Sequence, residues 1–429
     1  MKSVFFKISC IFFLTLLPFN LLSQVKIDVM IDDINDTILY LLKYKSDKTQ
    51  IIVDSSSISS KNKVFSGNTN YDEGIYVLAD SKQQPLFEIL LGKDQKFSIH
   101  IEELMDLNAY KIMGCKETKD YFKVYSKTVH SKLYIKALES EIKYYPDNVR
   151  KIDSVENELR EYQESMLSKD KNSFLNTYIK SIEKVIVPKD VKHVEKYIIE
   201  HYFDNIPLCD TRILNSRLLK NKLDDFFSNY MKLQSPVYIS EQIDNLILKT
   251  NDCHEVRDYI LWYLYSRFFN TDNVDDEFVF IHLVDKYFST LDIKNLTDNI
   301  RNEIVKRANV LRGITIGQTA PHFSFIDDNG NDISFDCIDS KYTVLFFYKP
   351  DCQKCIRDKR ILELVKKRQK DLTILYINIS EDNHSNVSQD ILLQYDIMTT
   401  PTIYLLNENK EIIAKHINVE EIEFYIIKR

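Results

Sequence analysis

The sequence has few of the residues that interrupt a folded chain. Its 429 residues include only 7 glycines and 9 prolines, which argues against long flexible linkers. It also lacks a repeat of fixed period, such as the tetratricopeptide pattern, so a simple repeat array is excluded. Because a chain of this length exceeds one ordinary domain, we expect two or three domains joined by short connections.

The chain also lacks a large excess of charge of either sign. It has 57 Lys and Arg against 64 Asp and Glu, a net charge of -7, and the two signs are interspersed. This pattern is typical of a solvated surface. It gives no reason to expect nucleic acid or an anionic membrane as a partner. The hydrophobic fraction of 44% is ordinary for a globular protein.

A mostly apolar run lies at the N-terminus. Positive residues precede it, it covers 8–17, and Pro18 and Asn20 interrupt it. A membrane-spanning helix needs about 20 predominantly apolar residues, so an uncleaved anchor is not expected. The pattern predicts a secretory signal peptide over 1–23. We therefore expect the protein in the periplasm or elsewhere in the cell envelope.

Apart from Cys10, which lies in the predicted signal peptide, the cysteines fall into one close pair and four scattered residues. Cys352 and Cys355 are separated by two residues. An exported compartment permits disulfides, but four scattered cysteines imply no dense disulfide framework. Since cysteine is among the most often buried residue types, we expect unpaired buried thiols at these four positions. They are Cys115, Cys209, Cys253 and Cys337.

The stretch 342–360 carries the clearest chemical signal. Its unbroken apolar run 344–348 predicts a strand buried on both faces of a sheet, and Pro350 ends that strand. A helical pattern follows, in which Cys355, Asp358 and Leu362 share one face. The two cysteines are therefore expected where a strand turns into a helix.

That position has a consequence for cysteine chemistry. The first turn of a helix presents unpaired N–H groups and the positive end of the helix dipole. Both favour the thiolate of Cys352, and the thiolate is the species that attacks a disulfide. Cys355, one turn into the helix, is near enough to close a small disulfide. We therefore interpret Cys352 as the nucleophile and Cys355 as the resolving thiol.

The predicted secondary structure changes twice along the chain, which divides it into three regions. Residues 24–113 read as short strands at regular spacing, which predicts a small antiparallel sandwich or barrel. Residues 114–313 show helical periodicity, with seven or eight helices expected and a helical hairpin turning near Pro146. In 314–429, a hairpin around Gly330 precedes strands and helices in β-α-β order. A further strand hairpin and a closing helix predict a mixed sheet covered by helices.

Three motifs of the C-terminal part carry a resemblance. They are G-x-x-A-P-x-F-x-F-x-D-x-x-G over 317–330, the pair Cys352-Gln353-Lys354-Cys355, and Thr400-Pro401. In this order and spacing they resemble the TlpA/ResA-like extracytoplasmic thiol–disulfide oxidoreductases, which have the thioredoxin fold. The resemblance covers about the last quarter of the chain. The β region and the helical middle look like the segments that often precede such domains. The whole is expected to be a multidomain α+β protein.

The resemblance implies roles for particular residues. Pro401 matches a cis proline beside the active site, which leaves the backbone of Thr400 free to pair with an extended substrate segment. Asp358 matches a position where these proteins often carry a glutamate, and it could exchange a proton with Cys355. The alternative is a rim carboxylate paired with Arg357 or Lys359. No cofactor is expected, and the implied partners are disulfide-containing substrate proteins and a membrane-embedded electron donor.

The sequence also departs from the family pattern, which leaves alternatives open. Pro350-Asp351 stands where thioredoxins commonly have a tryptophan, and the single Trp262 lies far away. The direction of electron flow therefore stays open. One rival is a binding or scaffold protein with an accessory thioredoxin module. A second rival, a copper carrier using His384 or His416, is disfavoured because such carriers usually space their cysteines by three residues.

Overall fold

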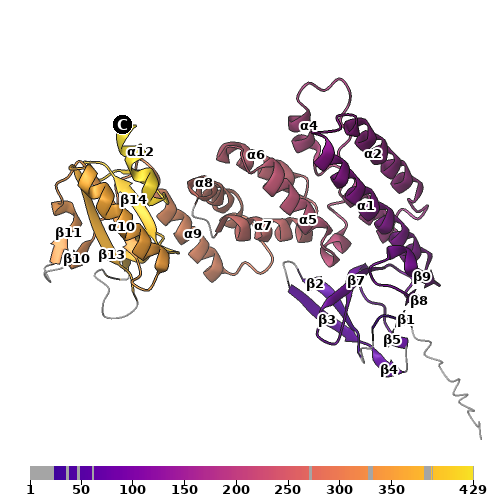
Figure 1. Cartoon of the computed structure of the whole chain (residues 1–429). Helices are drawn as coiled ribbons and strands as arrows, with labels where there is room; N and C mark the ends of the chain where they lie inside the picture. The colour runs from indigo at the N-terminus through magenta and orange to yellow at the C-terminus, as the bar shows by residue number, and fades with distance from the viewer. Residues whose placement is uncertain are drawn as a thin grey trace, which may run out of the picture. The chain divides into compact units, whose positions relative to one another are not determined.

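The structure is a computed structural model that describes residues 24–34, 38–45, 49–59, 62–269, 273–326, 332–380, 388 and 390–428 (Figure 1). The predicted signal peptide, 1–23, lies outside the described residues. The chain divides into two compact units, residues 1–185 with 204–222, and residues 186–203 with 223–429. The three domain boundaries read from the sequence remain predictions.

The described residues of the first unit form two β-sheets. One has the strand order β4-β5-β1-β8-β9 and the other has the order β3-β2-β6-β7. The strands are β1 (Val25–Ile31), β2 (Tyr40–Lys45), β3 (Thr49–Ser55), β4 (Ser57–Ser59), β5 (Asn62–Gly67), β6 (Gly74–Ala79), β7 (Pro85–Leu91), β8 (Lys96–Ile101) and β9 (Tyr110–Met113).

The expectation of a purely antiparallel β domain is wrong at one place, because β1 and β8 pair in parallel from Lys26 with Lys96 to Ile31 with Ile101. Residues of β1 alternate between buried and exposed sides, as in a half-buried strand. That alternation reveals the buried face but not the direction of a neighbour some 70 residues away along the chain.

Three helices complete the core of the first unit, together with the short 3-10 helices Leu107–Ala109 and Thr211–Asn215. They are α1 (Lys116–Glu141), α2 (Asn148–Ser165) and α3 (Phe174–Ile182). Helix α1 buries Tyr121, Phe122 and Val124 in one hydrophobic cluster with the strands. Helices α1 and α2 pack against each other across the turn at Pro146, which confirms the predicted helical hairpin.

The second unit begins with helices. They are α4 (Val194–His201), α5 (Leu218–Asp225, whose first residues belong to the first unit), α6 (Pro236–Leu248), α7 (His254–Phe269), α8 (Val274–Leu283) and α9 (Asp298–Gly313), with π-helical turns at Phe226–Tyr230 and Val284–Phe288. The described part of 114–313 thus holds nine α-helices rather than seven or eight. Helices of eight or nine residues, such as α3, α4 and α5, carry too little periodic pattern to be counted reliably from sequence.

The C-terminal part of the second unit is a mixed sheet with the order β13-β12-β14-β15. Its elements are β10 (Ser324–Ile326), β11 (Asp332–Ser334), β12 (Tyr342–Tyr348), α10 (Gln353–Arg368), β13 (Leu372–Asn378), α11 (Asp390–Gln394), β14 (Thr402–Leu406), β15 (Ile412–Lys415), a 3-10 turn Val419–Glu421 and α12 (Ile422–Ile427). Strands β12 and β13 are parallel, whereas β14 pairs antiparallel with both β12 and β15. This is the topology of the thioredoxin fold, and it confirms the predicted mixed sheet.

Both faces of the central strand β12 are covered. On one side Phe346 packs with Leu362 of α10 and Ile422 of α12. On the other side the ring of Phe347 lies 5.3 Å from that of Tyr395 and 6.0 Å from that of Tyr404, measured between centroids. The apolar run is therefore a strand buried on both faces, as predicted.

A buried ion cluster fixes helix α8 to strand β15. The carboxylate of Glu277 pairs with Lys415, whose side chain is 0% exposed, and accepts a second bond from His416 Nε2 at 2.9 Å. Glu277 itself is only 3% exposed. Because an unpaired charge in such a place would be strongly destabilising, the helix and the sheet stabilise each other through this cluster.

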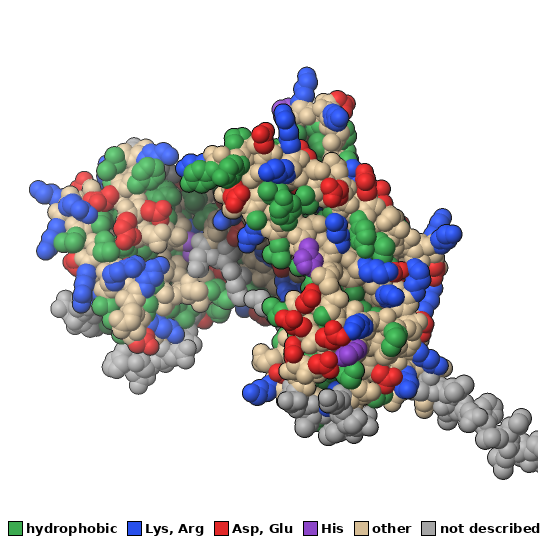
Figure 2. Space-filling view, turned by 45° about the vertical axis from the view of Figure 1, so that its right-hand side comes forward, with side chains coloured by type: hydrophobic (Ala, Val, Ile, Leu, Met, Phe, Trp, Pro, Cys, Tyr) green, Lys and Arg blue, Asp and Glu red, His purple; other side chains and the backbone are tan. Residues whose placement is uncertain are grey.

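The face of the molecule in Figure 2 carries Lys and Arg side chains interspersed with Asp and Glu, and no large area of one sign. This distribution matches the solvated surface expected from composition. Within the described ranges, no helix combines the length and apolar character needed to cross a membrane.

Candidate active site

The two cysteines lie where β12 gives way to α10. Cys352 is the N-cap of α10, with extended backbone angles of φ -79° and ψ 112°, and the helix begins at Gln353. The sequence predicted a helix from about Cys355. The earlier start places Cys352 directly at the end of the helix, where unpaired N–H groups are concentrated.

Cys352 and Cys355 form a disulfide, with their Cα atoms 5.2 Å apart. Cys355 is buried, with 1% of its surface exposed, whereas Cys352 is half-buried. The N–H of Cys355 donates a hydrogen bond to Cys352 Sγ over 3.1 Å. An incoming disulfide can therefore reach Cys352, and the bond from the helix stabilises negative charge on that sulfur.

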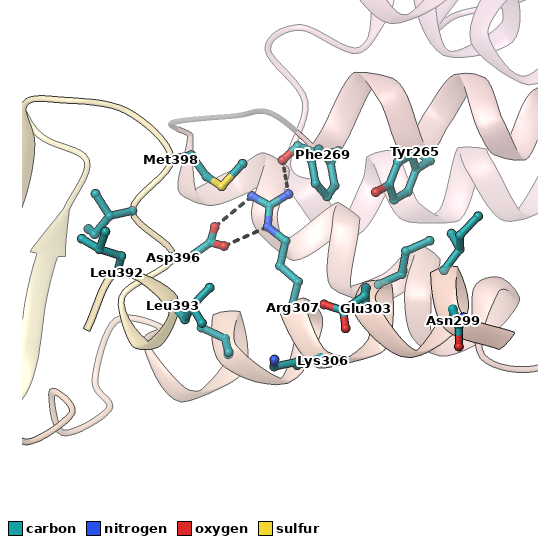
Figure 3. Close-up of a pocket in the computed structure, with 14 residues that line it drawn as sticks. Tyr265, Phe269, Asn299, Glu303, Lys306, Arg307, Leu392, Leu393, Asp396 and Met398 are labelled. Carbon is teal, nitrogen blue, oxygen red and sulfur yellow. Dashed lines mark hydrogen bonds and ion pairs between the residues drawn. The ribbon is translucent and has the colours of Figure 1, made fainter. Parts of the chain in front are cut away.

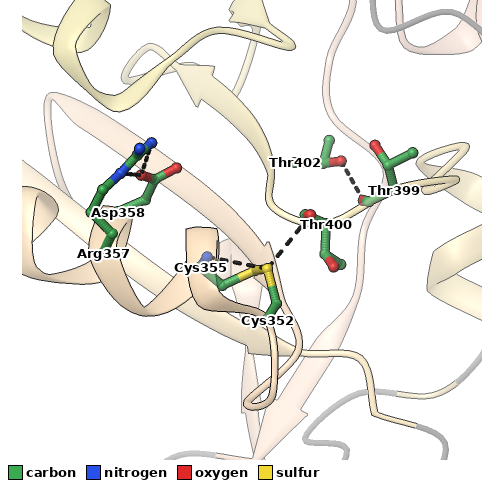
Figure 4. The surroundings of a disulfide bond; sticks show 7 residues. All are labelled: Cys352, Cys355, Arg357, Asp358, Thr399, Thr400 and Thr402. Carbon is green, nitrogen blue, oxygen red and sulfur yellow. Dashed lines mark hydrogen bonds and ion pairs between the residues drawn. A yellow bond between two sulfur atoms is a disulfide. The ribbon is translucent and has the colours of Figure 1, made fainter.

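The segment before β14 faces the same sulfur. The Thr400–Pro401 peptide bond is cis, and the carbonyl oxygen of Thr400 lies 3.6 Å from Cys352 Sγ (Figure 4). In the reduced form the thiol of Cys352 could donate to this carbonyl. The hydroxyl of Thr402 donates to the carbonyl of Thr399 at 2.8 Å, which closes the turn beside the cysteines.

Asp358 lies one helical turn after Cys355 and is only 2% exposed. Its Oδ1 accepts from Nε of Arg357 at 2.9 Å and pairs with Nη2 at 2.8 Å (Figure 4). The side chain of Arg357 is 62% exposed. The carboxylate is thus paired with Arg357, as one interpretation expected, but it lies on the buried face with Cys355 and not at the rim, and its proton exchange with Cys355 stays a prediction.

An ion pair that the sequence did not reveal connects helix α9 to the segment just before Thr400. Arg307 of α9 donates to Asp396 from Nε at 2.9 Å and from Nη2 at 2.8 Å. Its guanidinium also lies 4.0 Å from the ring centroid of Phe269. Both charged side chains are 12% exposed. The pair joins residues 89 positions apart, so no local pattern indicates it.

The remaining cysteines correct the expectation of four buried free thiols. Cys115 is free and buried, as expected, and Cys337 is free but exposed. Cys209 and Cys253 are each disulfide-bonded, so the expectation is wrong for these two. Spacing along the chain could not reveal this, because a disulfide depends on the folded positions of both sulfurs.

Metal ligands do not gather in the part of the chain that the structure describes, since no group of three or more His, Cys, Asp or Glu is placed to hold an ion. Of the two histidines considered for copper, His384 lies outside the described residues. The side chain of His416 is 7% exposed, and its Nε2 is bonded to Glu277.

Comparisons with known proteins found similarities in family models and in solved structures. Residues 333–416 match the family described as TraF, F plasmid transfer operon protein. A thioredoxin-like protein from Bacteroides caccae aligns over 58% of this chain and 98% of its own, at 20% identity and a TM-score of 0.47.

Two further solved structures align over 27% of this chain. A domain of a possible thiol-disulfide isomerase from Cytophaga hutchinsonii does so over 92% of its own length, at 27% identity and a TM-score of 0.24. A thiol:disulfide interchange protein from Bacteroides sp. does so over 89%, at 21% identity and a TM-score of 0.23. No curated protein matches. The strand topology itself defines the C-terminal part as a thioredoxin fold with a cysteine pair at its helix N-terminus.

Proposed function

We propose that the protein is an exported thiol–disulfide oxidoreductase of the TlpA/ResA-like kind, which reduces or exchanges disulfides of substrate proteins. One observation carries the proposal. The half-buried Cys352 Sγ lies between the N–H of Cys355 and the carbonyl of Thr400, and its disulfide partner Cys355 is buried behind it. This arrangement gives one sulfur for attack and one for resolution.

The reaction follows from the two positions. The thiolate of Cys352 attacks one sulfur of a substrate disulfide, forms a mixed disulfide and releases the other substrate sulfur as a thiolate. Cys355, once deprotonated, attacks Cys352 Sγ. The mixed disulfide breaks, the second substrate thiolate leaves, and the Cys352–Cys355 disulfide forms. The substrate gains two electrons and the cysteine pair loses them.

Asp358 is proposed to accept the proton of Cys355 during resolution. It lies on the same buried helix face one turn away, where few other groups can take a proton. In this buried place the carboxylate is paired with Arg357, whose own side chain is 62% exposed.

Thr400 and Pro401 are proposed to bind the substrate backbone. Thr400 precedes β14, and its carbonyl faces the reactive sulfur. An extended substrate segment can pair with the backbone there, as in β-strand addition, and so bring its disulfide to Cys352.

The compartment and the electron donor rest on the sequence. The predicted signal peptide supports a periplasmic or cell-envelope location. Reduction of substrates in that compartment would need a source of electrons, and the family resemblance supports a membrane-embedded donor that restores the dithiol.

A binding or scaffold protein of the cell envelope is the second candidate. The β and helical region before residue 314 supports it, because this region makes up about two-thirds of the chain. A Cys355→Ser variant separates the candidates in cells, because an oxidoreductase would accumulate mixed disulfides through Cys352 and a scaffold would not.

The reduction potential of the cysteine pair is the primary test. Mature protein would be equilibrated in dithiothreitol or glutathione buffers and read by thiol alkylation, with Cys352→Ser as control. A value near about -270 mV would support a reductase, and one near about -120 mV would indicate an oxidant or isomerase. A pair that does not cycle reversibly would favour the scaffold.

A further inference from the structure

An apolar pocket of about 470 Å³ lies within the second unit, between helices α7 and α9 and the segment that leads from α11 to Thr400 (Figure 3). Its apolar side chains include Phe269, Ile300, Ile304, Leu393 and Met398. The volume is within the range of about 300–1,000 Å³ found for ligand sites, and it exceeds what one side chain fills.

The chain that lines the pocket continues to the residue that faces Cys352. Met398 lines it and stands two residues before Thr400, whose carbonyl oxygen is 3.6 Å from Cys352 Sγ. Consecutive Cα atoms are about 3.8 Å apart, so Met398 and Thr400 are at most about 7.6 Å apart along the chain. A polypeptide bound at Thr400 therefore reaches the pocket within a few residues of its cysteine.

The wall of the pocket is held in place before any ligand binds. Arg307 on α9 and Asp396 on the opposite segment both line the pocket, and their two hydrogen bonds join its sides. Both side chains are 12% exposed, so the pair is largely shielded from water. A preformed wall lowers the conformational cost of binding.

The chemistry of the lining favours an uncharged occupant. Four charged side chains line it, and Asp396 and Glu303 balance Arg307 and Lys306. The apolar rim stays open to solvent, with exposures of 42% for Ile300, 63% for Leu393 and 55% for Met398. Exposed apolar side chains gathered at the edge of a pocket are typical of a binding surface.

We infer that this pocket binds bulky apolar side chains that lie within a few residues of the cysteine in an extended substrate polypeptide. The inference rests on the proposed function and names its substrate class: disulfide-containing proteins whose cysteine is flanked by uncharged apolar sequence. Continuity with Thr400 argues for a polypeptide, because the chain that is bound there must continue past the pocket.

A direct binding measurement tests the pocket without any redox chemistry. Two fluorescent peptides carry serine in place of cysteine, one with Leu and Phe flanks and one with Ser and Asp flanks. We expect wild-type protein to bind the apolar peptide at least about tenfold more tightly, and Ile300→Asp to remove that difference. Leu364→Asp is the matched control. Leu364 is 56% exposed on α10 and does not line the pocket, so its variant should bind as wild type does.

Several outcomes would overturn the inference. Equal binding of the two peptides by wild type would do so, as would equal weakening by Ile300→Asp and Leu364→Asp. Sedimentation that shows a dimer dispersed by Ile300→Asp, with no peptide bound, would assign the pocket to a second copy of the chain instead.

Turnover of a small disulfide separates this inference from the proposed function. If wild type reduces glutathione disulfide but reduces apolar-flanked and polar-flanked peptide disulfides with the same kcat/KM, the oxidoreductase stands and the pocket inference falls. If the cysteine pair does not cycle but the apolar peptide still binds wild type and not Ile300→Asp, the pocket stands and the oxidoreductase falls.

Discussion

Two helices of this molecule have a cysteine as their N-cap, but the surroundings of the two cysteines differ. Helix α1 has Cys115 as its N-cap, at φ -97° and ψ 118°, and helix α10 has Cys352, at φ -79° and ψ 112°. Both helices are long, with 26 and 16 residues, so both present a dipole and unpaired N–H groups to a cysteine.

The surroundings of the two N-caps differ. Cys115 is 2% exposed and makes no capping hydrogen bond through its side chain. Cys352 is half-buried and accepts a bond from the N–H of Cys355. Both cysteines thus lie at a helix N-terminus, but of the two only Cys352 also has solvent access and a directed N–H donor, which favour thiol reactivity.

The buried faces of helices α1 and α10 also differ in the chemistry of their side chains. Three residues after the N-cap, α1 has Thr118, whose hydroxyl donates to the carbonyl of Leu90 at 2.9 Å, and α10 has the disulfide-bonded Cys355. Three residues further on, α1 has Tyr121, fully buried in the core, and α10 has Asp358. One face is a closed core and the other carries groups that can exchange electrons and protons.

Replacing each N-cap cysteine by serine should give the largest difference in activity between the two helices. We expect Cys352→Ser to abolish reduction of a disulfide substrate, because Cys355, the other sulfur of the pair, is only 1% exposed and out of reach of a substrate. Cys115→Ser should keep the wild-type rate. Turnover of a peptide disulfide with dithiothreitol as electron source measures both. Equal loss in the two variants would mean that the helix end acts through stability alone.

Alkylation of the reduced protein compares the two thiols in one sample. Because Cys352 is half-buried and accepts the N–H of Cys355, whereas Cys115 is only 2% exposed, we expect Cys352 to react with iodoacetamide at least about tenfold faster than Cys115 near pH 7. Mass spectrometry of quenched digests gives both rates. Similar rates would show that burial does not protect Cys115 and would break the comparison.

The carboxylate of α10 should matter for rate. We expect Asp358→Asn to slow resolution of the mixed disulfide about 100-fold or more, within the range of general acid–base catalysis, and to shift the pH profile of that step. Rapid mixing with a preformed mixed disulfide measures the rate. Asp120→Asn in α1 is the matched control, and an unchanged pH profile for Asp358→Asn would leave that residue with a structural role only.

The carboxylate of Asp120 in α1 should contribute only slightly to the free energy of unfolding. Burial opposes ionisation of Asp120, but hydrogen bonds from Lys116 and Lys123 outweigh it and hold the pKa of the carboxyl below its usual value. A lowered pKa stabilises the folded state above the unfolded value, near about 3.9, and this contribution is lost as the pH falls through the folded value.

Asp120→Asn should therefore cost about 0.5 kcal/mol at neutral pH, since both lysines are largely exposed and solvent screens them. Thermal unfolding of wild type and variant at pH about 7 and about 3 checks this, and the difference should shrink at the lower pH. A difference that grows on acidification would contradict the sign of the pKa shift.

What could be read from the sequence was local. The apolar run before Pro350, the spacing of the cysteines and the position of Asp358 all fall within one strand and one helix, so their periodicity indicated β12, α10 and the shared face. The sequence did not reveal the parallel pairing of β1 with β8 or the bond between Arg307 and Asp396. Such contacts depend on how distant elements pack, which a local pattern does not encode.

The cluster of Glu277, Lys415 and His416 should affect how this fold evolves, because it makes the thioredoxin fold depend on helix α8. A thioredoxin fold transferred alone into another protein would lose the partner of Lys415, and a foreign helix in the place of α8 would have to supply a carboxylate at one position. Removing one member of such a buried pair typically costs about 3–5 kcal/mol. We therefore expect relatives that contain this thioredoxin fold to contain helix α8 as well. We also expect substitutions at Glu277 and Lys415 to be correlated among relatives.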